Sequence, residues 1–145
     1  MSDIERIRQA CLDFSACVLR EQTGYQYEVR LKNGIQRFVN AVKTDLTALV
    51  KVIPTLAWAE RDAVTSFLDE LTPWATPSFI ESLWKLARRE KDQSVQFNLI
   101  SALVGYLSEK KSHEGQLQPP LGGISQEVEA SYRQQLQKLS GLKNF

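Results

Sequence analysis

The hydrophobic positions between Arg30 and Ile53 recur with the period of an α-helix. At about 100° per residue, seven apolar side chains fall on one stripe: Leu31, Ile35, Phe38, Val42, Leu46, Leu49 and Ile53. A polar stripe lies opposite, formed by Arg30, Asn33, Arg37, Asn40, Thr44, Thr47 and Lys51. Asn33-Gly34 is a turn signal that could start the helix, but Leu31 continues the apolar stripe before it, which favours a helix running through. We therefore predict one amphipathic helix from Arg30 to a stop at Pro54.

The segments on either side of this central helix show the same period. A first helix is expected from Asp3 to about Gln22, with the inward positions Ile4, Ile7, Cys11, Phe14 and Val18. Another is expected to begin near Trp58, with Ala63, Val64, Phe67, Leu68 and Leu71 inward. Its outer face is acidic and comprises Glu60, Asp62, Asp69 and Glu70.

The second half of the chain has clear start and stop signals. The segment 72–77, with two prolines, is expected to form a stiff corner, and Ser78 with Glu81 forms a capping box for a helix to Arg89. Asp92 is placed to cap a further helix ending near Lys111. The inward residues of these two helices are Phe79, Ile80, Leu83, Trp84, Ala87, Val95, Leu99, Leu103 and either Tyr106 or Leu107.

The segment 112–123 contains two prolines and three glycines and has no hydrophobic period, so we expect a flexible loop there. Ser125 then caps a last, weakly packed helix to about Leu139. No alternating strand pattern is present. The whole pattern predicts an all-α fold, a single domain over residues 1–145 built as one antiparallel bundle of five or six helices.

Composition supports a globular domain and leaves the partner open. The 145 residues suffice for one core, and a hydrophobic share of 43% argues against general disorder. No apolar run approaches the roughly 18 residues of a membrane span, and the N-terminus is charged, so we expect a cytoplasmic protein that does not contact membranes. Cys11 and Cys17 lie about 240° apart around a helix and are expected to be buried free thiols.

Candidate catalytic chemistry is sparse. His113, the only histidine, falls in the expected loop without a metal-ligand partner, so a solvated side chain is favoured over a ligand. The acidic outer face near Glu60 is more typical of a solvated surface than of a cation site. Phosphate-loop, nucleophile-elbow and paired-cysteine zinc patterns are missing from the sequence. We therefore expect a protein that is not an enzyme and has no cofactor and no metal.

The distribution of charge is the main functional signal. The net charge is only +1, yet Arg30 to Lys51 carries five cations against one anion, Asp45. Arginines seven residues apart stand about 10 Å apart along a helix, a spacing that suits contacts to a phosphate backbone. A second basic group lies around the end of the helix at Arg89. The candidate nucleic-acid-binding residues are Arg30, Asn33, Arg37, Asn40, Thr44 and Lys51 in the first group, and Lys85, Arg88, Arg89 and Lys91 in the second.

Two structural readings of these groups stay open. Any surface helix has a solvated face, and cations at a helix C-terminus also offset the helix dipole. If nucleic acid is bound, side chains of these types position a backbone without distinguishing bases, so little sequence preference is expected. We assign base stacking to none of the three tryptophans.

An all-helical domain of this length, with a basic helix face and no catalytic constellation, resembles the helical small subunit of CRISPR effector complexes of the Cascade type, in particular the type I-D version. The residues that carry the likeness are LKNGIQRFVNAVKTDLTALVKVI, TPWATPSFIESLWKLARREK and SVQFNLISALVGYLSEKK. The resemblance implies a non-catalytic subunit that contacts the backbone of the crRNA and of the target or displaced DNA strand. It also implies contacts with other effector-complex subunits and with neighbouring copies of itself. The alternative is a helical protein–protein adaptor or assembly chaperone that binds no nucleic acid.

Overall fold

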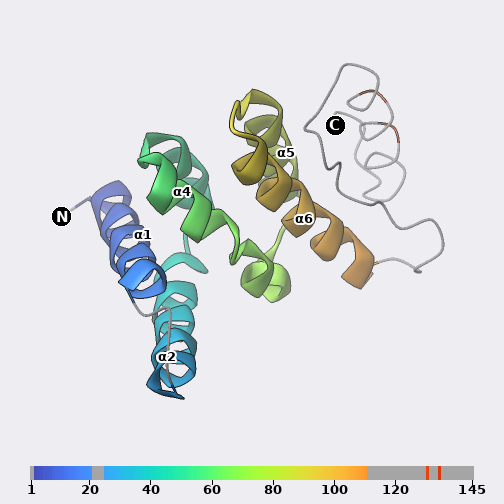
Figure 1. Ribbon diagram of the computed structural model, residues 1–145. Helices are drawn as coiled ribbons and strands as arrows, with labels where there is room; N and C mark the ends of the chain where they lie inside the picture. The colour runs from blue at the N-terminus through green and yellow to red at the C-terminus, as the bar shows by residue number, and fades with distance from the viewer. Residues whose placement is uncertain (1, 21–24, 111–129, 131–133, 135–145) are drawn as a thin grey trace.

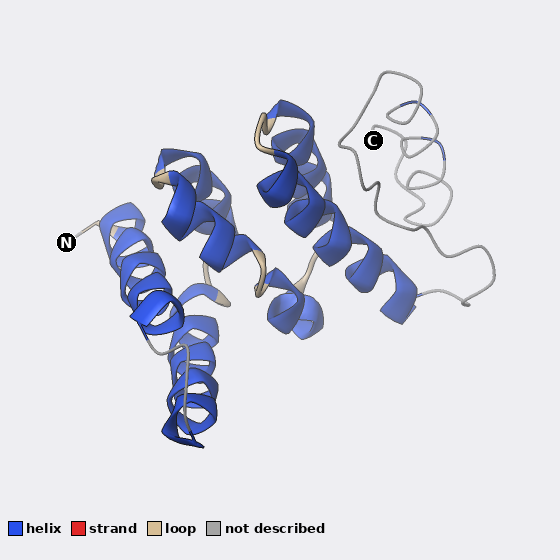
Figure 2. Cartoon of the chain, viewed as in Figure 1, coloured by secondary structure: helices blue, strands red, loops and turns tan. Residues whose placement is uncertain are grey.

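The computed structural model describes residues 2–20 and 25–110 together with positions 130 and 134. Six α-helices and two short 3-10 helices make up the described chain (Figure 1): α1 Asp3–Arg20, α2 Tyr25–Val42, α3 Leu46–Val52, η1 Ile53–Thr55, α4 Trp58–Thr65, η2 Leu68–Trp74, α5 Pro77–Arg89 and α6 Gln93–Lys110. No strand occurs among the described residues (Figure 2), which confirms the all-α class. His113, the loop expected at 112–123 and most of the last expected helix lie outside them.

The central helix predicted from Arg30 to Ile53 is wrong as a single element. It begins earlier, at Tyr25, runs through Gly34 as expected, and then breaks at residues 43–45. Asp45 causes the break, since its carboxylate accepts the backbone N–H of Ala48 at 3.0 Å and caps the new helix α3. This break, together with the 3-10 helices, raises the number of helical elements above the five or six predicted.

Gly34 is a point where α1 and α2 approach closely. A Cβ atom at this position would lie 3.0 Å from the Sγ atom of Cys17. The two helices form an antiparallel hairpin, because Arg6 Nη1 donates to the carbonyl of Ala41 at 2.8 Å while the Cys17 thiol donates to the carbonyl of Arg30 at 3.6 Å. The glycine that weakens the helix locally therefore permits its packing.

The cysteines are free, as predicted, but only one is fully buried. Cys11 has no exposed surface, and burial raises the pKa of its thiol to about 12. Cys17 is half-buried in the hairpin.

α5 and α6 pack against each other, and on their other sides α3 packs against α5 and α4 against α6 (Figure 1). Between α4 and α6, Ser94 Oγ donates to the Asp62 carboxylate at 2.8 Å and Asn98 Nδ2 donates to the same carboxylate at 3.0 Å. One turn further along α4, Thr65 Oγ1 also accepts from Asn98 Nδ2. Beyond the end of α4, at the start of η2, the carbonyl of Leu68 accepts from the hydroxyl of Tyr106. The contacts advance together along both elements, so α4 and α6 run in the same direction.

Several predicted boundaries need correction. The helix starting at Trp58 ends at Thr65, and the expected corner is occupied by the 3-10 helix η2 up to Trp74. Thr76, and not Ser78, caps α5, since its hydroxyl accepts the backbone N–H of Phe79 at 3.2 Å. Asp62, which was predicted to face outward, is half-buried because its carboxylate accepts a hydrogen bond from Ser94 of α6.

The core combines residues from all the helices. Every inward residue predicted for α5 is buried, and in α6 Tyr106 is buried, whereas the side chain of the alternative, Leu107, lies outside the described part of the structure. The break shifts the apolar face of α3, so Leu46 is only partly buried while Leu49 has no exposed surface. Burial also raises the pKa of the Tyr106 phenol far above its ordinary value.

Asp92 is expected to make the stability of the fold sensitive to acid. As predicted, it caps α6, its carboxylate accepting the backbone N–H of Val95 at 3.0 Å. This bond, followed by a hydrogen bond from the side chain of Trp58, lowers the pKa of Asp92 below its ordinary value of 3.8. A carboxyl with a lowered pKa stabilises the folded state above its unfolded pKa, and that stability is lost as the pH falls through the folded value.

We therefore expect Asp92→Asn to flatten the decline in unfolding free energy below about pH 4, as measured by urea denaturation across the acid range. Asp13→Asn is the control, because Asp13 accepts only from the exposed side chain of Gln9. Equal acid profiles for the two variants would contradict the expected role of Asp92.

Candidate nucleic-acid interface

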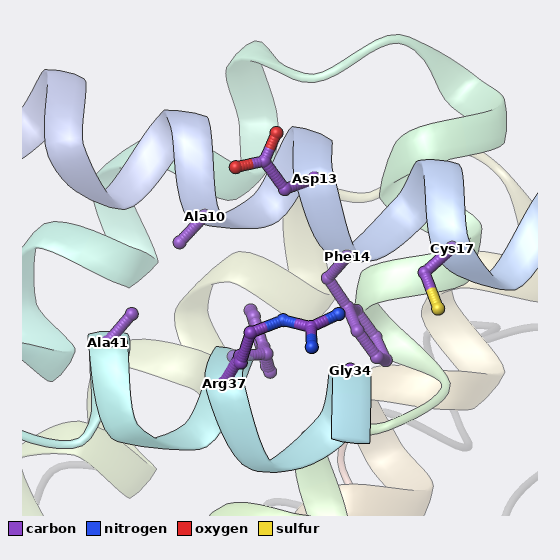
Figure 3. Close-up of a pocket in the computed structure, with 8 residues that line it drawn as sticks. Ala10, Asp13, Phe14, Cys17, Gly34, Arg37 and Ala41 are labelled. Atoms are coloured by element: carbon purple, nitrogen blue, oxygen red, sulfur yellow. The ribbon is translucent and has the colours of Figure 1, made fainter. Parts of the chain in front are cut away.

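The predicted residues in the middle of α2 form one exposed group. Arg30, Asn33 and Arg37 are all exposed. Arg37 lies across the groove between α1 and α2 towards Phe14, and Asp13 lies on the opposite wall (Figure 3). The pocket there is small, about 180 Å³, and the Asp13 carboxylate accepts from Gln9 Nε2 at 2.8 Å. This group can offer cations to a backbone passing along α2.

The break at 43–45 separates these residues from the rest of the predicted stripe. Asn40 lines a pocket between α2 and η2, whereas Thr44 lines a second pocket between α3 and α5. Asp45, the only anion of the segment, is turned inward as the cap of α3. The continuous polar rail expected from Arg30 to Lys51 is therefore not present, and its members fall into separate groups.

The structure joins Lys51 to the second predicted group instead. Thr47 and Val50 of α3 line the same pocket as Ser78 and Ser82 of α5. The starts of both helices lie at this pocket, so the helices run side by side in the same direction. Lys51 and Lys85, both exposed, come one turn beyond Thr47 and Ser82 on these two packed helices.

The exposed cations Lys51, Lys85, Arg88 and Arg89, with Lys91 in the following turn, are named here the α3–α5 basic patch. The anions closest to it in sequence are engaged elsewhere. Glu90 Oε2 lies 3.0 Å from Nε of Arg61, whose Nη1 also donates to the carbonyl of Leu56 at 2.9 Å. Asp92 is the cap of α6.

Within the patch itself, Lys85 Nζ lies 3.4 Å from a carboxylate oxygen of Glu81, a largely exposed contact. Such exposed pairs contribute little and exchange readily with other anions. The patch therefore keeps a net positive surface, since the charge of Glu90 is already compensated by Arg61.

Two residues near the predicted groups were not identified from the sequence. Trp74 is 39% exposed and lines both the Asn40 pocket and the Thr44 pocket. Lys43 lies over its ring, with Nζ 5.2 Å from the ring centroid. The sequence signal was the tryptophan between two prolines in the segment 72–77, but its proximity to α2 depends on tertiary contacts.

The described residues show no group of three or more His, Cys, Asp or Glu side chains that could hold a metal ion. Among the same residues, no helix has both the length and the apolar character needed to cross a membrane.

Comparisons with known proteins identify no relative. A scan against protein-family models gives no match, and searches of curated proteins and of solved structures give none either.

Proposed function

We propose that this protein is a non-catalytic nucleic-acid-binding subunit of a ribonucleoprotein complex, in which it contacts backbone phosphates and stabilises the assembly. The resemblance in the sequence extends this proposal to the small subunit of a cytoplasmic CRISPR effector complex. In that complex its partners are the crRNA, the target or displaced DNA strand, other subunits and neighbouring copies of the chain.

The observation that supports the proposal best is the α3–α5 basic patch. Its cations come from α3, from α5, which packs against α3, and from the turn after α5, and the neighbouring anions Glu90 and Asp92 have structural roles. Exposed lysine and arginine side chains release counterions when they meet phosphates, so clustered cations favour a polyanion over a neutral partner. The cations Arg30 and Arg37 on α2 extend the surface available to a long strand.

The double substitution Lys51→Gln with Arg89→Gln tests this function. Binding of a fluorescently labelled oligonucleotide is measured by anisotropy at several salt concentrations. If each residue contacts one phosphate, the slope of log affinity against log salt becomes shallower by about 1.4 to 1.8. Binding at low salt should also weaken for unrelated sequences alike, because backbone contacts do not distinguish bases.

The matched control is Arg6→Gln with Arg8→Gln, which removes the same charge from α1. Arg6 donates to a backbone carbonyl of α2 and Arg8 to the hydroxyl of Thr55, so both serve structural contacts away from the patch. The proposal fails if wild-type protein binds no oligonucleotide at low salt, or if both double variants lose the same amount of binding.

The second candidate function is that of a protein–protein adaptor. It is favoured by three exposed apolar side chains, Leu12 and Leu19 on α1 and Val29 on α2, of which the last two flank the connection between these helices. Exposed apolar residues that group on one part of a surface mark partner contacts. An adaptor that binds no nucleic acid would show no oligonucleotide binding at low salt even as the wild type, so the experiment above separates the two functions.

A further inference from the structure

The exposed side chain of Trp74 lines two neighbouring surface pockets. The first pocket lies between α2 and η2 and has a volume of about 440 Å³. The polar residues that line it beside Trp74 are Lys32, Gln36, Asn40 and Glu70. The second, between α3 and α5, is lined in part by Lys43, Thr44, Thr47 and Ser82. The first falls in the size range of about 300–1,000 Å³ typical of ligand sites.

The exposure of Trp74 contrasts with that of the other two tryptophans. Trp84 is fully buried in the core. Trp58 is 54% exposed, but its side chain has a structural role because it hydrogen-bonds the Asp92 carboxylate. Trp74 leaves 39% of its surface in solvent beside two hollows, with Lys43 over its ring.

Trp74 has the Lys43 ammonium over one face of its ring, and further cationic and amide side chains line the pocket beside it. Lys43 and Lys32 supply positive charge, and Gln36 and Asn40 supply amide donors. Bases of single-stranded nucleic acids stack on exposed aromatic rings while adjacent cations bind the backbone. A base inside a duplex cannot reach such a ring, because both of its faces are already stacked.

We propose that Trp74 is a stacking platform for an unpaired base and that this surface binds single-stranded nucleic acid. The backbone next to that base lies against Lys43 and Thr44, in the second pocket, which Thr47 of α3 and Ser82 of α5 also line. This inference rests on the proposed function and adds strandedness to it. Stacking accepts any base, so the expected lack of sequence preference is retained.

The charged residues that line the two pockets are Lys32 and Lys43 against Asp45 and Glu70. Of the carboxylates that line the two pockets, that of Asp45 is held by the backbone of α3, whereas Glu70 is exposed at the wall of the first. Removing the charge of Glu70 should therefore strengthen the binding of a phosphate backbone.

Trp74→Ala is compared with Trp58→Ala, which removes an exposed indole on α4. The probes are a labelled 15-nucleotide oligothymidylate and a labelled 15-base-pair duplex at low salt. We expect Trp74→Ala to weaken oligothymidylate binding by about 5- to 150-fold, the equivalent of about 1–3 kcal/mol for one stacked base. Duplex binding should change by less than about twofold, Trp58→Ala should change neither, and Trp74→Phe should restore part of the affinity.

Unfolding curves establish that each variant is folded before binding is measured. The inference is overturned if Trp74→Ala weakens duplex and single strand equally, or if it has no more effect than Trp58→Ala. The Lys51→Gln/Arg89→Gln variant is measured with the same probes. If it loses binding while Trp74→Ala does not, only the stacking assignment fails; if wild-type protein binds neither probe, the proposed function fails.

Two further arms sharpen the assignment. Glu70→Gln should bind oligothymidylate about two- to fivefold more tightly, and weaker binding would indicate a site for a basic ligand and contradict the proposal. Comparing oligodeoxyuridylate with oligouridylate, which differ only in the sugar, shows which sugar the surface prefers, since the proposed stacking operates on either.

Discussion

Trp84→Ala is expected to destabilise the protein by about 3–5 kcal/mol, the usual cost of deleting a large buried aromatic side chain. Trp84 has no exposed surface and lies on α5, which packs against both α3 and α6. The deletion leaves a cavity that the surrounding helices can close only in part, so the loss exceeds the transfer free energy of the indole alone. Urea denaturation monitored by circular dichroism measures the change.

Trp58→Ala is the control for this substitution. Trp58 is 54% exposed and contributes chiefly its hydrogen bond to Asp92, so its removal should cost no more than about 1.5 kcal/mol. Similar losses for the two variants would show that α5 does not form the centre of the core.

Glu90→Ala should produce the second large effect, a loss of about 3 kcal/mol. Its carboxylate pairs with Arg61 at 3.0 Å and accepts the backbone N–H of Asp92 at 3.1 Å, and the exposures of the Glu90 and Arg61 side chains are 9% and 19%. Removing one partner leaves the other charge largely buried, which typically costs about 3–5 kcal/mol. The low end applies because Arg61 retains some contact with water.

Glu81→Ala is the matched control, since Glu81 pairs with Lys85 on the exposed surface of α5. An exposed pair four residues apart contributes about 0.3–0.5 kcal/mol and weakens in salt. Chemical denaturation at low and high salt should therefore separate the two pairs. If Glu90→Ala costs as little as Glu81→Ala, the pair joining α4 to the α5–α6 turn does not stabilise the fold.

Gln96, which no sequence pattern identified, stabilises the turn between α5 and α6. Its side-chain amide is buried and donates to the carbonyls of Ala87 and Glu90 at 2.8 and 3.2 Å. These carbonyls belong to the end of α5, where backbone acceptors have no partner within the helix. The shape of the α5–α6 turn, and with it the position of Arg89 and Lys91, depends on this contact.

The sequence by itself determined the helical class, the inward faces of α5 and α6, and the capping of α6 by Asp92. These features follow from local rules, because a period of three to four residues and a capping side chain act within one or two turns. The buried positions Ile80, Leu83 and Leu99 follow from that period alone.

The path of the chain was decided only by tertiary structure. The hydrophobic period predicted that the helix continues through residues 43–45. Instead, Asp45 caps a new helix, α3, whose residues Leu49 and Val52 are buried in the core. Gly34 likewise has its explanation in another helix, through the close approach of Cys17.

The candidate site depends on the fold in the same way. The sequence identified exposed polar side chains correctly but arranged them on one straight helix. Breaking that helix packed α3, which carries Lys51, against α5, which carries Lys85, and brought Asn40 and Thr44 to pockets that Trp74 also lines. Residues more than 30 positions apart become neighbours through packing between helices, and no local pattern of hydrophobic and polar residues encodes which faces will meet.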